Sequence, residues 1–374
     1  MLAACVLALA TTCAPVSLGD GPRRQAVRAL TEDVVRPSLA DVAARAAELS
    51  AAAAALAAAP SQATLDAARA AWRAARAPWK ECDAFAFGPA SDDRLAVAID
   101  QVPVEPAKIE AEIAGTAALT VDYVETLGAD RKGFHAIEHV LFGAGDDAAV
   151  LASLTTDAAA ARRRDLVAAL AGNLERKVAE LGRAWAPDGG GYAEAVAAPG
   201  ASNPTYPTIK SVIDAFVNQT VFLTEVVADA RIGKPLGLAT GGAPAPALEE
   251  SGPSDNSLAD MAASVRGIRA IYTGARDGAA GGGGGGGGGS TGGGGISALV
   301  AAQRPAIDRE ARQLLDRALA AIEAIPRPFR VAVVEHQAEV QAAYDAVKEL
   351  KVLLATEVLA ALGATLSFND NDGD

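Results

Sequence analysis

The alanine-rich composition is the feature that most constrains what this chain can fold into. Hydrophobic residues make up 51% of the 374 residues, yet aromatic residues make up only 4%, so alanine, leucine and valine account for much of the apolar fraction. Alanine and leucine favour helices, whereas β-sandwiches and barrels need more aromatic and β-branched residues. No segment shows the alternation of polar and apolar residues that marks a strand. The composition therefore predicts an all-α protein.

Apolar residues recur at helical spacing along most of the chain, and Pro- and Gly-rich segments separate the helices. A loop over 187–207, dense in Gly, Pro, Ser and Asn, marks the best domain boundary. We expect two helical bundles packed side by side with a cleft between them, over 22–200 and 205–374. Pro37 is expected to kink or divide the first helix, and 88–106 to form a loop. The expected helices cover 23–58, 62–83, 105–114, 117–127, 132–142, 156–185, 208–231, 257–272, 296–325 and 329–362.

The 37 glycines are concentrated in one place. Thirteen of them form the runs 281–289 and 292–295, so the rest of the chain has an ordinary share. Such a tract cannot hold a fixed structure. It predicts a flexible surface insertion at 278–295 within the second domain.

Residues 1–13 form an apolar stretch of small residues, as in the apolar part of a secretory leader, and the leader is expected over 1–20. Leu2-Ala3-Ala4-Cys5 has the form of a bacterial lipoprotein cleavage box, and Cys13 is a second candidate for lipidation. Four residues ahead of Cys5 are too few for a signal, and a basic segment is missing, so either the true start lies upstream or the signal ends nearer Cys13 or Ser17. An apolar leader without a targeting role is the alternative. No later segment offers 18 uncharged apolar residues, and no membrane-spanning helix is predicted. We expect export to the cell envelope, to the periplasm or outer surface, with the membrane reached only through an N-terminal lipid anchor.

The chain is acidic, with 33 Lys and Arg against 46 Asp and Glu and a net charge of −13. Such a surface repels nucleic-acid phosphates and anionic lipid heads, so nucleic-acid binding is excluded as a function class. It suits a cationic ligand or a metal ion better. Only Cys82 of the three cysteines lies in the folded body, so no intramolecular disulfide is expected there.

Two of the three histidines lie close together in the sequence, at His135 and His139, with Glu138 between them. Positions i, i+3 and i+4 share one face of a helix, so the three side chains can converge on a metal ion. Imidazole and carboxylate suit zinc or iron. The spacing also matches the His-x-x-Glu-His signature of inverted zinc peptidases, in which the glutamate is the catalytic base. The alternative is a polar helix face exposed to solvent, or a histidine whose hydrogen-bonding groups have partners within a bundle core.

A second candidate cluster lies on one predicted helix face, where Trp72, Arg76 and Trp79 place an arginine between two indoles. In a functional interpretation, Arg76 orients a carboxylate of a binding site. In the structural alternative, the face belongs to the bundle core and the arginine extends to solvent. Glu81 either adds a ligand or is solvated.

A third cluster, over 249–260, combines acidic and hydroxyl groups in a loop that opens a helix. Capping by Ser254 or Asn256 explains part of this composition. It does not explain Glu250 and Asp260 equally well, so the segment is also a candidate lining of a site.

The segment Gly133-x-His135-x-x-Glu138 matches the Gly-x-His-x-x-Glu motif of the imelysin family, which the chain resembles. Supporting segments follow in order at 72–78, 87–89, 99–100 with Pro103, 250–260, 268–274 and 366–374. The resemblance implies two helical bundles with a site in the cleft, His135 and Glu138 lying opposite 251–260. It also adds Asp100 and Ser251 to the cleft. The family includes iron-regulated bacterial envelope proteins and was named for metallopeptidases.

Three hypotheses follow, and we favour the first. An exported metal-binding protein for bacterial iron acquisition would use His135, Glu138 and His139, completed by Glu81, Glu250 or Asp260; iron is favoured and zinc is the alternative. Its partner would be an envelope iron-transport component. A zinc metallopeptidase would use the two histidines as ligands and Glu138 as base. A metal-free protein would bind a peptide or small ligand in the cleft.

Overall fold

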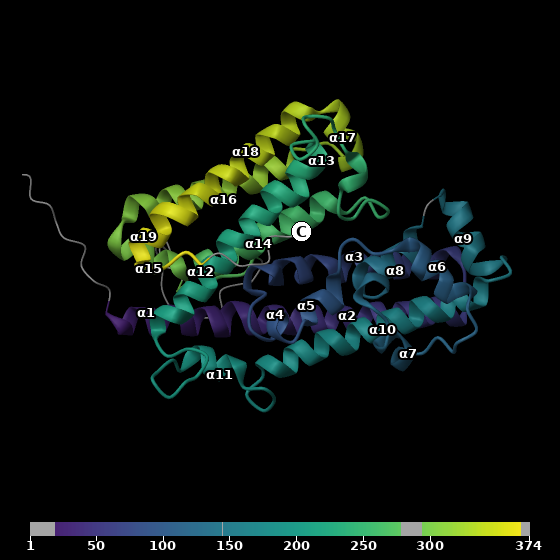
Figure 1. The fold of residues 1–374 in the computed structure, drawn as a ribbon, viewed down its shortest axis with the longest axis horizontal. Coiled ribbons are helices and arrows are strands. Elements are labelled where there is room, and N and C mark those ends of the chain that lie inside the picture. Colours follow the sequence, from purple (N-terminus) through teal and green to yellow (C-terminus); the bar gives the residue numbers. More distant parts are fainter. Residues whose placement is uncertain (1–18, 144, 278–293, 368–374) are drawn as a thin grey trace, which may run out of the picture.

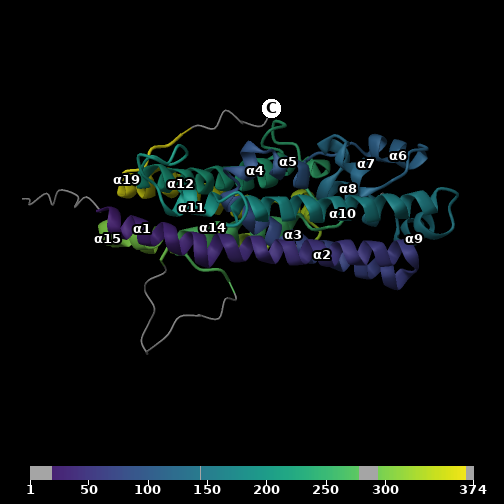
Figure 2. The same cartoon turned by 90° about the horizontal axis from the view of Figure 1, so that it is seen from below.

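The computed structural model describes residues 19–143, 145–277 and 294–367. Within these ranges every regular element is a helix, which confirms the all-α prediction. Figure 1 shows two groups of long helices lying side by side, one from each half of the chain, and Figure 2 shows the molecule from below, with the long N-terminal helix running along it. The expected leader and the expected polyglycine insertion lie outside the described residues, apart from 19–20 and 294–295.

Three long helical segments form the first bundle. The first runs without interruption through α1 (Asp20–Ala29), η1 (Leu30–Val35) and α2 (Arg36–Ala58), and it packs against α3 (Gln62–Cys82) and α10 (Ala160–Trp185). α8 (Gly133–Phe142) lies on α3 and α10. The remaining elements are short: η2 (Asp83–Phe85), α4 (Pro89–Asp92), α5 (Leu95–Asp100), α6 (Pro106–Ala114), α7 (Val121–Glu125), η3 (Ala129–Arg131), α9 (Asp147–Thr155) and α11 (Tyr192–Ala197).

The second bundle centres on α14 (Ser257–Thr273), which packs against α12 (Ile209–Glu225) and α16 (Pro305–Glu323). α18 (Gln337–Leu353) lies on both α12 and α16. The other elements are η4 (Val226–Gly233), α13 (Lys234–Leu236), η5 (Pro246–Leu248), α15 (Ile296–Gln303), α17 (Phe329–Glu335), η6 (Leu354–Val358) and α19 (Leu359–Leu362).

The helix expected over 23–58 is continuous, but a π-helical stretch at η1 directly precedes Pro37. Proline has no N–H and its ring clashes with the carbonyl one turn earlier, so a wider turn accommodates it. The helix expected over 296–325 is divided at Pro305 for the same reason. Helices α4, α5 and α11 lie inside the two expected loops, and α9 was not predicted.

The helix expected over 329–362 is also divided, at His336, between α17 and α18. The ends of α3 and α8 agree with the expectation. The Ser61 hydroxyl accepts a hydrogen bond from the Thr64 amide at 3.2 Å and so caps α3, and α8 ends at Gly143, whose φ is +53°.

The two bundles meet along α3 and α14, which pack closely because of one glycine. A Cβ at Gly267 of α14 would clash with the backbone carbonyl of Glu81 on α3. The N-terminal helix also crosses the boundary, since α1 contacts α12 and α15. The packing of α3 on α14 places the middle of α3 beside the segment that leads into α14.

The combined helix Ile209–Leu236 is long and apolar enough to span a membrane by length and composition. The sequence predicts no membrane-spanning helix, because this stretch carries Asp214, Glu225 and Asp229 and so offers no 18 uncharged apolar residues. A core helix passes the same test, and 56% of the apolar window is buried inside the molecule, where α12 packs on α14 and α18.

Candidate functional site

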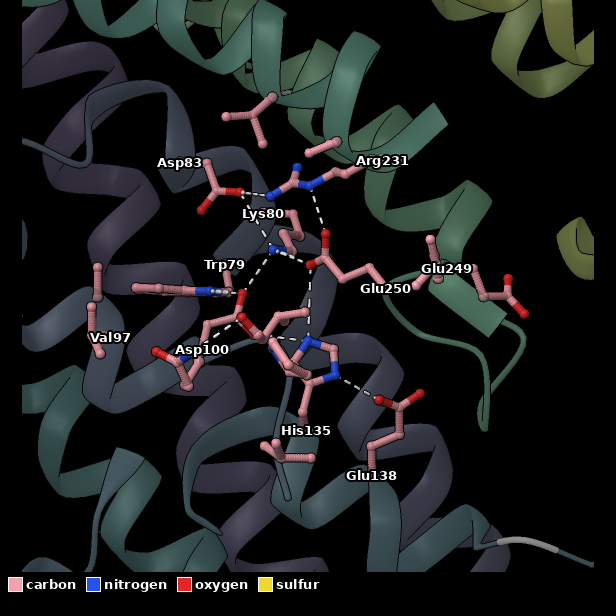
Figure 3. A pocket seen from close by; sticks show the side chains of 18 of the residues that line it. Trp79, Lys80, Asp83, Val97, Asp100, His135, Glu138, Arg231, Glu249 and Glu250 are labelled. Carbon is pink, nitrogen blue, oxygen red and sulfur yellow. Dashed lines mark hydrogen bonds and ion pairs between the residues drawn. The ribbon is translucent and has the colours of Figure 1, made fainter. Parts of the chain in front are cut away.

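A pocket of about 780 Å³ lies between the two bundles. Its lining comes from α3, α5 and α8 of the first bundle and from α12, η4 and the segment before α14 of the second. Figure 3 shows charged side chains from both bundles converging in it. The charged and imidazole side chains at its centre are Lys80, Asp83, Asp100, His135, Arg231 and Glu250.

Gly133 explains how α8 reaches this position. Its φ is +78°, a conformation that favours glycine, and a Cβ there would clash with the carbonyl oxygen of Ile99. The indole of Trp72 donates a hydrogen bond to the Phe134 carbonyl at 2.9 Å and ties α8 to α3. The start of α8 therefore lies against the end of α5, which brings His135 beside Asp100.

The two ring nitrogens of His135 face different groups. Nδ1 lies 2.7 Å from Glu138 Oε2, while Nε2 lies 3.3 Å from Asp100 Oδ1 and 3.8 Å from Glu250 Oε1. Glu138 is itself held from the other domain, because its Oε1 accepts hydrogen bonds from the Ser254 amide at 3.1 Å and hydroxyl at 2.6 Å. Glu138 thus orients the imidazole, and Nε2 points at two carboxylates.

Asp100, His135 and Glu250 form a candidate metal-ligand group. One potential ligand atom from each lies within 4.8 Å of the other two. Two carboxylates and an imidazole form a donor set that suits iron, and also zinc.

Arg76 contacts all three of these residues. Its Nη2 lies 2.6 Å from Glu250 Oε1 and 3.0 Å from His135 Nε2, and Nη1 donates to Asp100. Its Nε donates to Asp260 Oδ2 at 3.1 Å. The guanidinium is fully buried, so it joins carboxylates of both domains inside the protein. Arg76 therefore does not extend to solvent. It contacts carboxylates of the site, as the functional interpretation predicts.

Lys80 and Arg231 supply further positive charge. Lys80 Nζ lies 2.7 Å from Asp100 Oδ2 and 2.5 Å from Glu250 Oε1. Arg231 lies 2.6 Å from Glu250 Oε2 and 2.9 Å from Asp83 Oδ2. We call these groups the ionic cluster, which comprises Arg76, Lys80 and Arg231 with Asp83, Asp100, Glu138, Glu250 and Asp260. Its carboxylates outnumber its cationic side chains by two, five against three, when His135 is neutral.

The cluster shifts the acidity of its members. Burial alone would raise the pKa values of Asp100 and Glu250. Arg76 and Lys80 outweigh this effect at Asp100, and Arg231 and Lys80 outweigh it at Glu250. Both pKa values therefore lie well below the usual range. For His135, burial and Arg76 oppose protonation. The hydrogen bonds to Asp100, Glu138 and Glu250 are stronger and raise its pKa to about 10.

The hydroxyl-rich segment before α14 serves the cluster. Ser251 Oγ donates to Asp260 Oδ2 at 2.6 Å, and Asn256 Nδ2 donates to Asp260 Oδ1 at 2.7 Å. Asn256 occupies the N-cap position but makes no side-chain capping bond, and Ser254 binds Glu138 instead. The capping explanation therefore does not hold for these two side chains.

Three predicted ligands lie elsewhere than expected. His139 Nε2 lies 2.8 Å from Glu110 Oε1, so it is engaged away from the His135 group although it lines the pocket. Glu138 lies behind His135 rather than with the ligand atoms. Glu81 points toward Arg266, 3.6 Å away, and does not line the pocket. Helical spacing predicts a shared face, but it does not reveal which neighbour each side chain meets.

Sequence reasoning missed the roles of Trp79, Lys80 and Arg231 in the cluster. The Trp79 indole donates to Asp100 Oδ2 at 2.8 Å, so it is a hydrogen-bond donor as well as an apolar wall. Lys80 follows Arg76 by four residues and shares its helix face, which was an available signal. Arg231 offered none, because only the packing of η4 brings it to Glu250.

The fold and the site together define a class of two-domain helical proteins whose buried ionic residues lie where the bundles meet. The family model for imelysin matches residues 35–354, and the chain belongs to the imelysin family. It is 30% identical over 345 residues to iron-regulated protein A of Synechococcus elongatus, covering 91% of this chain and 84% of that protein. Family and relative are consistent with an iron-related function.

Two solved structures share the fold. A protein described as an iron-regulated protein A precursor from Parabacteroides distasonis aligns with a TM-score of 0.78 at 23% identity, covering 93% of this chain and 96% of that one. An imelysin-like protein from Psychrobacter arcticus aligns with a TM-score of 0.75 at 17% identity, covering 95% and 100%. Both likenesses support the two-bundle architecture.

Proposed function

We propose that the protein binds iron in the pocket between the bundles, with Asp100, His135 and Glu250 as its protein ligands. The observation that carries the proposal is the orientation of His135. Its Nδ1 is paired with Glu138 at 2.7 Å, and its Nε2 faces two carboxylates. Metal-binding histidines commonly have this arrangement, in which an outer carboxylate fixes the ring so that the other nitrogen is free for the ion.

The charge balance of the ionic cluster supports a cation. The surplus of two carboxylates over cationic side chains matches the charge of one ferrous ion once binding has displaced the proton that His135, with its raised pKa, carries at neutral pH. Arg76 and Lys80 contact the same oxygens that would bind iron, and Arg76 Nη2 also lies 3.0 Å from His135 Nε2, so binding requires both cations to give up part of these contacts. These two residues then act as competitors that keep the affinity moderate, which suits a protein that must release its cargo.

The geometry favours binding over peptide hydrolysis. A zinc peptidase built on the motif would need His135 and His139 as joint ligands and Glu138 free to activate water. His139 is paired with Glu110, and both carboxylate oxygens of Glu138 accept hydrogen bonds or face His135. The donor set of two carboxylates and one imidazole suits iron and zinc alike, so the choice of iron rests on the relative named iron-regulated protein A.

We further propose that the chain acts in the cell envelope in bacterial iron acquisition. The leader over 1–20, with Cys5 or Cys13 as the lipidated residue, would deliver it there, and an envelope iron-transport component would receive the ion. Mass spectrometry of the mature N-terminus tests this part. A diacylglycerol adduct on either cysteine is the expected result, and an unprocessed Met1 would contradict it.

The test of iron binding is equilibrium dialysis of the purified protein against Fe²⁺ without oxygen, with iron measured by elemental analysis. We expect one iron per wild-type chain. His135→Ala and Glu250→Gln should each lower the affinity by more than about tenfold, because each removes a direct ligand, and even outer partners are worth about that much.

His139→Ala is the matched control, since it removes the other histidine of the same helix and should leave the affinity within about twofold. Thermal unfolding with and without Fe²⁺ separates loss of a metal-binding side chain from loss of the fold. A variant that folds but no longer binds iron still unfolds in a transition, and the temperature of that transition does not depend on Fe²⁺. Loss of iron in His139→Ala with retention in His135→Ala would overturn the assignment.

A further inference from the structure

The pocket is much larger than an iron ion needs. A water molecule takes about 30 Å³, so an ion with six waters occupies about 200 Å³. The pocket encloses about 780 Å³. This volume is in the range of sites that bind organic molecules. Most of the space therefore lies beyond the metal-ligand group.

The additional space is bounded by apolar side chains. One wall comes from α5 and the loop that follows it, and the other comes from α12, η4 and η5. A hydrated ion gains nothing from such walls, whereas an organic ligand buries apolar surface against them. The main apolar contributors are Val97, Val102, Val104, Phe222, Val226 and Leu248.

Three of these side chains are available to a ligand. Val102 is 42% exposed and Leu248 is 51% exposed, and they belong to different bundles, so both sides of the pocket present apolar surface to solvent. Phe222 is half-buried and takes part in none of the aromatic pairs found among the described residues. Its ring is free to pack on a ligand.

We infer that the cargo of this pocket is an iron chelate with an apolar or aromatic organic body, rather than the bare ion. The inference rests on the proposed function, because the ion would bind Asp100, His135 and Glu250. The chelator would fill the ion's other coordination positions and lie against Phe222 and Val226. Charged groups at one end and apolar walls beyond them match a ligand with a charged head and an apolar body.

The test compares two probes in dialysis without oxygen, Fe²⁺ alone and Fe²⁺ with one equivalent of 8-hydroxyquinoline, a flat bidentate chelator. We expect the wild-type protein to retain iron and quinoline in equal amounts, about tenfold more tightly than the bare ion. Phe222→Ala removes a packing surface, and Val226→Trp fills the apolar space. Both should weaken retention of the chelate about tenfold and leave that of bare iron within about twofold.

Val352→Trp is the matched control, because Val352 is an exposed valine on α18 that does not line the pocket. It should affect neither probe. Wild-type protein that retains iron but no quinoline would overturn the chelate inference and leave the iron proposal standing. Wild-type protein that retains neither form of iron would overturn both. Quinoline retained equally without iron, or by His135→Ala, would overturn the inference by showing a metal-independent ligand.

Discussion

At the scale of single residues, Glu138 has a role different from the one its spacing indicated. It lies between His135 and Ser254, so it links the imidazole of the first bundle to the backbone of the second. A carboxylate in this position fixes the ring orientation and increases the basicity of the ring. Glu138 is therefore a positioning residue for His135.

Glu138→Gln should lower iron affinity by about tenfold to a hundredfold, since the outer carboxylate is lost while the direct ligands stay. Glu110→Gln is the matched control, because Glu110 makes the equivalent pair with His139 at 2.8 Å. Dialysis measures the affinity, and the imidazole nitrogen signals in NMR report the state of the His135 ring. An unchanged affinity and an unchanged ring signal in Glu138→Gln would remove the positioning role.

At the scale of elements, the glycine of the motif accounts for the position of α8. Gly133 adopts a positive φ at the start of the helix, against the carbonyl of Ile99. No other residue allows that approach without strain. The Gly-x-His-x-x-Glu pattern thus combines a backbone requirement at its first position with an imidazole and the carboxylate that orients it.

Gly133→Ala should destabilise the protein by about 2 kcal/mol or more, because the Cβ clashes with backbone and the φ is strained. Gly182→Ala is the matched control: this glycine lies within α10, where an added Cβ would meet open space, and alanine there should stabilise by about 0.5–1 kcal/mol. Urea unfolding followed by circular dichroism measures both. Equal effects of the two substitutions would contradict the packing argument.

Helix boundaries show where local sequence suffices. Ser61 and Gly143 mark the ends of α3 and α8 through capping and a left-handed turn, and both were predictable from the sequence. The break at His336 was not, because no proline or glycine marks it. That boundary depends on how α17 packs against η5 and α18.

At the scale of the whole molecule, the ionic cluster joins the bundles. Arg76 and Asp100 of the first bundle pair with Glu250 and Asp260 of the second, either directly or through the shared guanidinium. Removing one member of a buried pair leaves an uncompensated charge, which costs about 3–5 kcal/mol. These ion pairs therefore help to hold the bundles together only while the groups are ionised.

Stability should fall as the pH drops below about 5. The pKa values of Asp100 and Glu250 are lowered in the folded state, so their contribution is present above the unfolded values near 4 and is lost as the pH falls through them toward the folded values. Urea unfolding between pH 7 and pH 3 measures this loss. Asp100→Asn should be less stable at pH 7 and show a smaller further loss.

Asp122→Asn is the control for acid sensitivity, since Asp122 pairs with Arg176 on the surface and its side chain is 90% exposed. It should follow the wild-type pH dependence closely. If the free energy of unfolding of Asp100→Asn also fell with pH as steeply as that of the wild type, the cluster would not govern stability in acid.

Composition, periodicity and capping act over one or two turns, so the helical class, the main helices and the residue types of the site are predictable from the sequence alone. The sequence also placed Arg76, His135 and Glu250 among the candidates. The folded packing alone reveals that Asp100 and Glu250 lie near Nε2 of His135, that Glu138 pairs with Nδ1 of the same ring, and that His139 pairs with Glu110. Contacts within the ionic cluster join segments up to 184 residues apart, as between Arg76 and Asp260. The packing of α3 on α14 sets the contacts across the two bundles, and local sequence carries no record of which side chains that packing brings together.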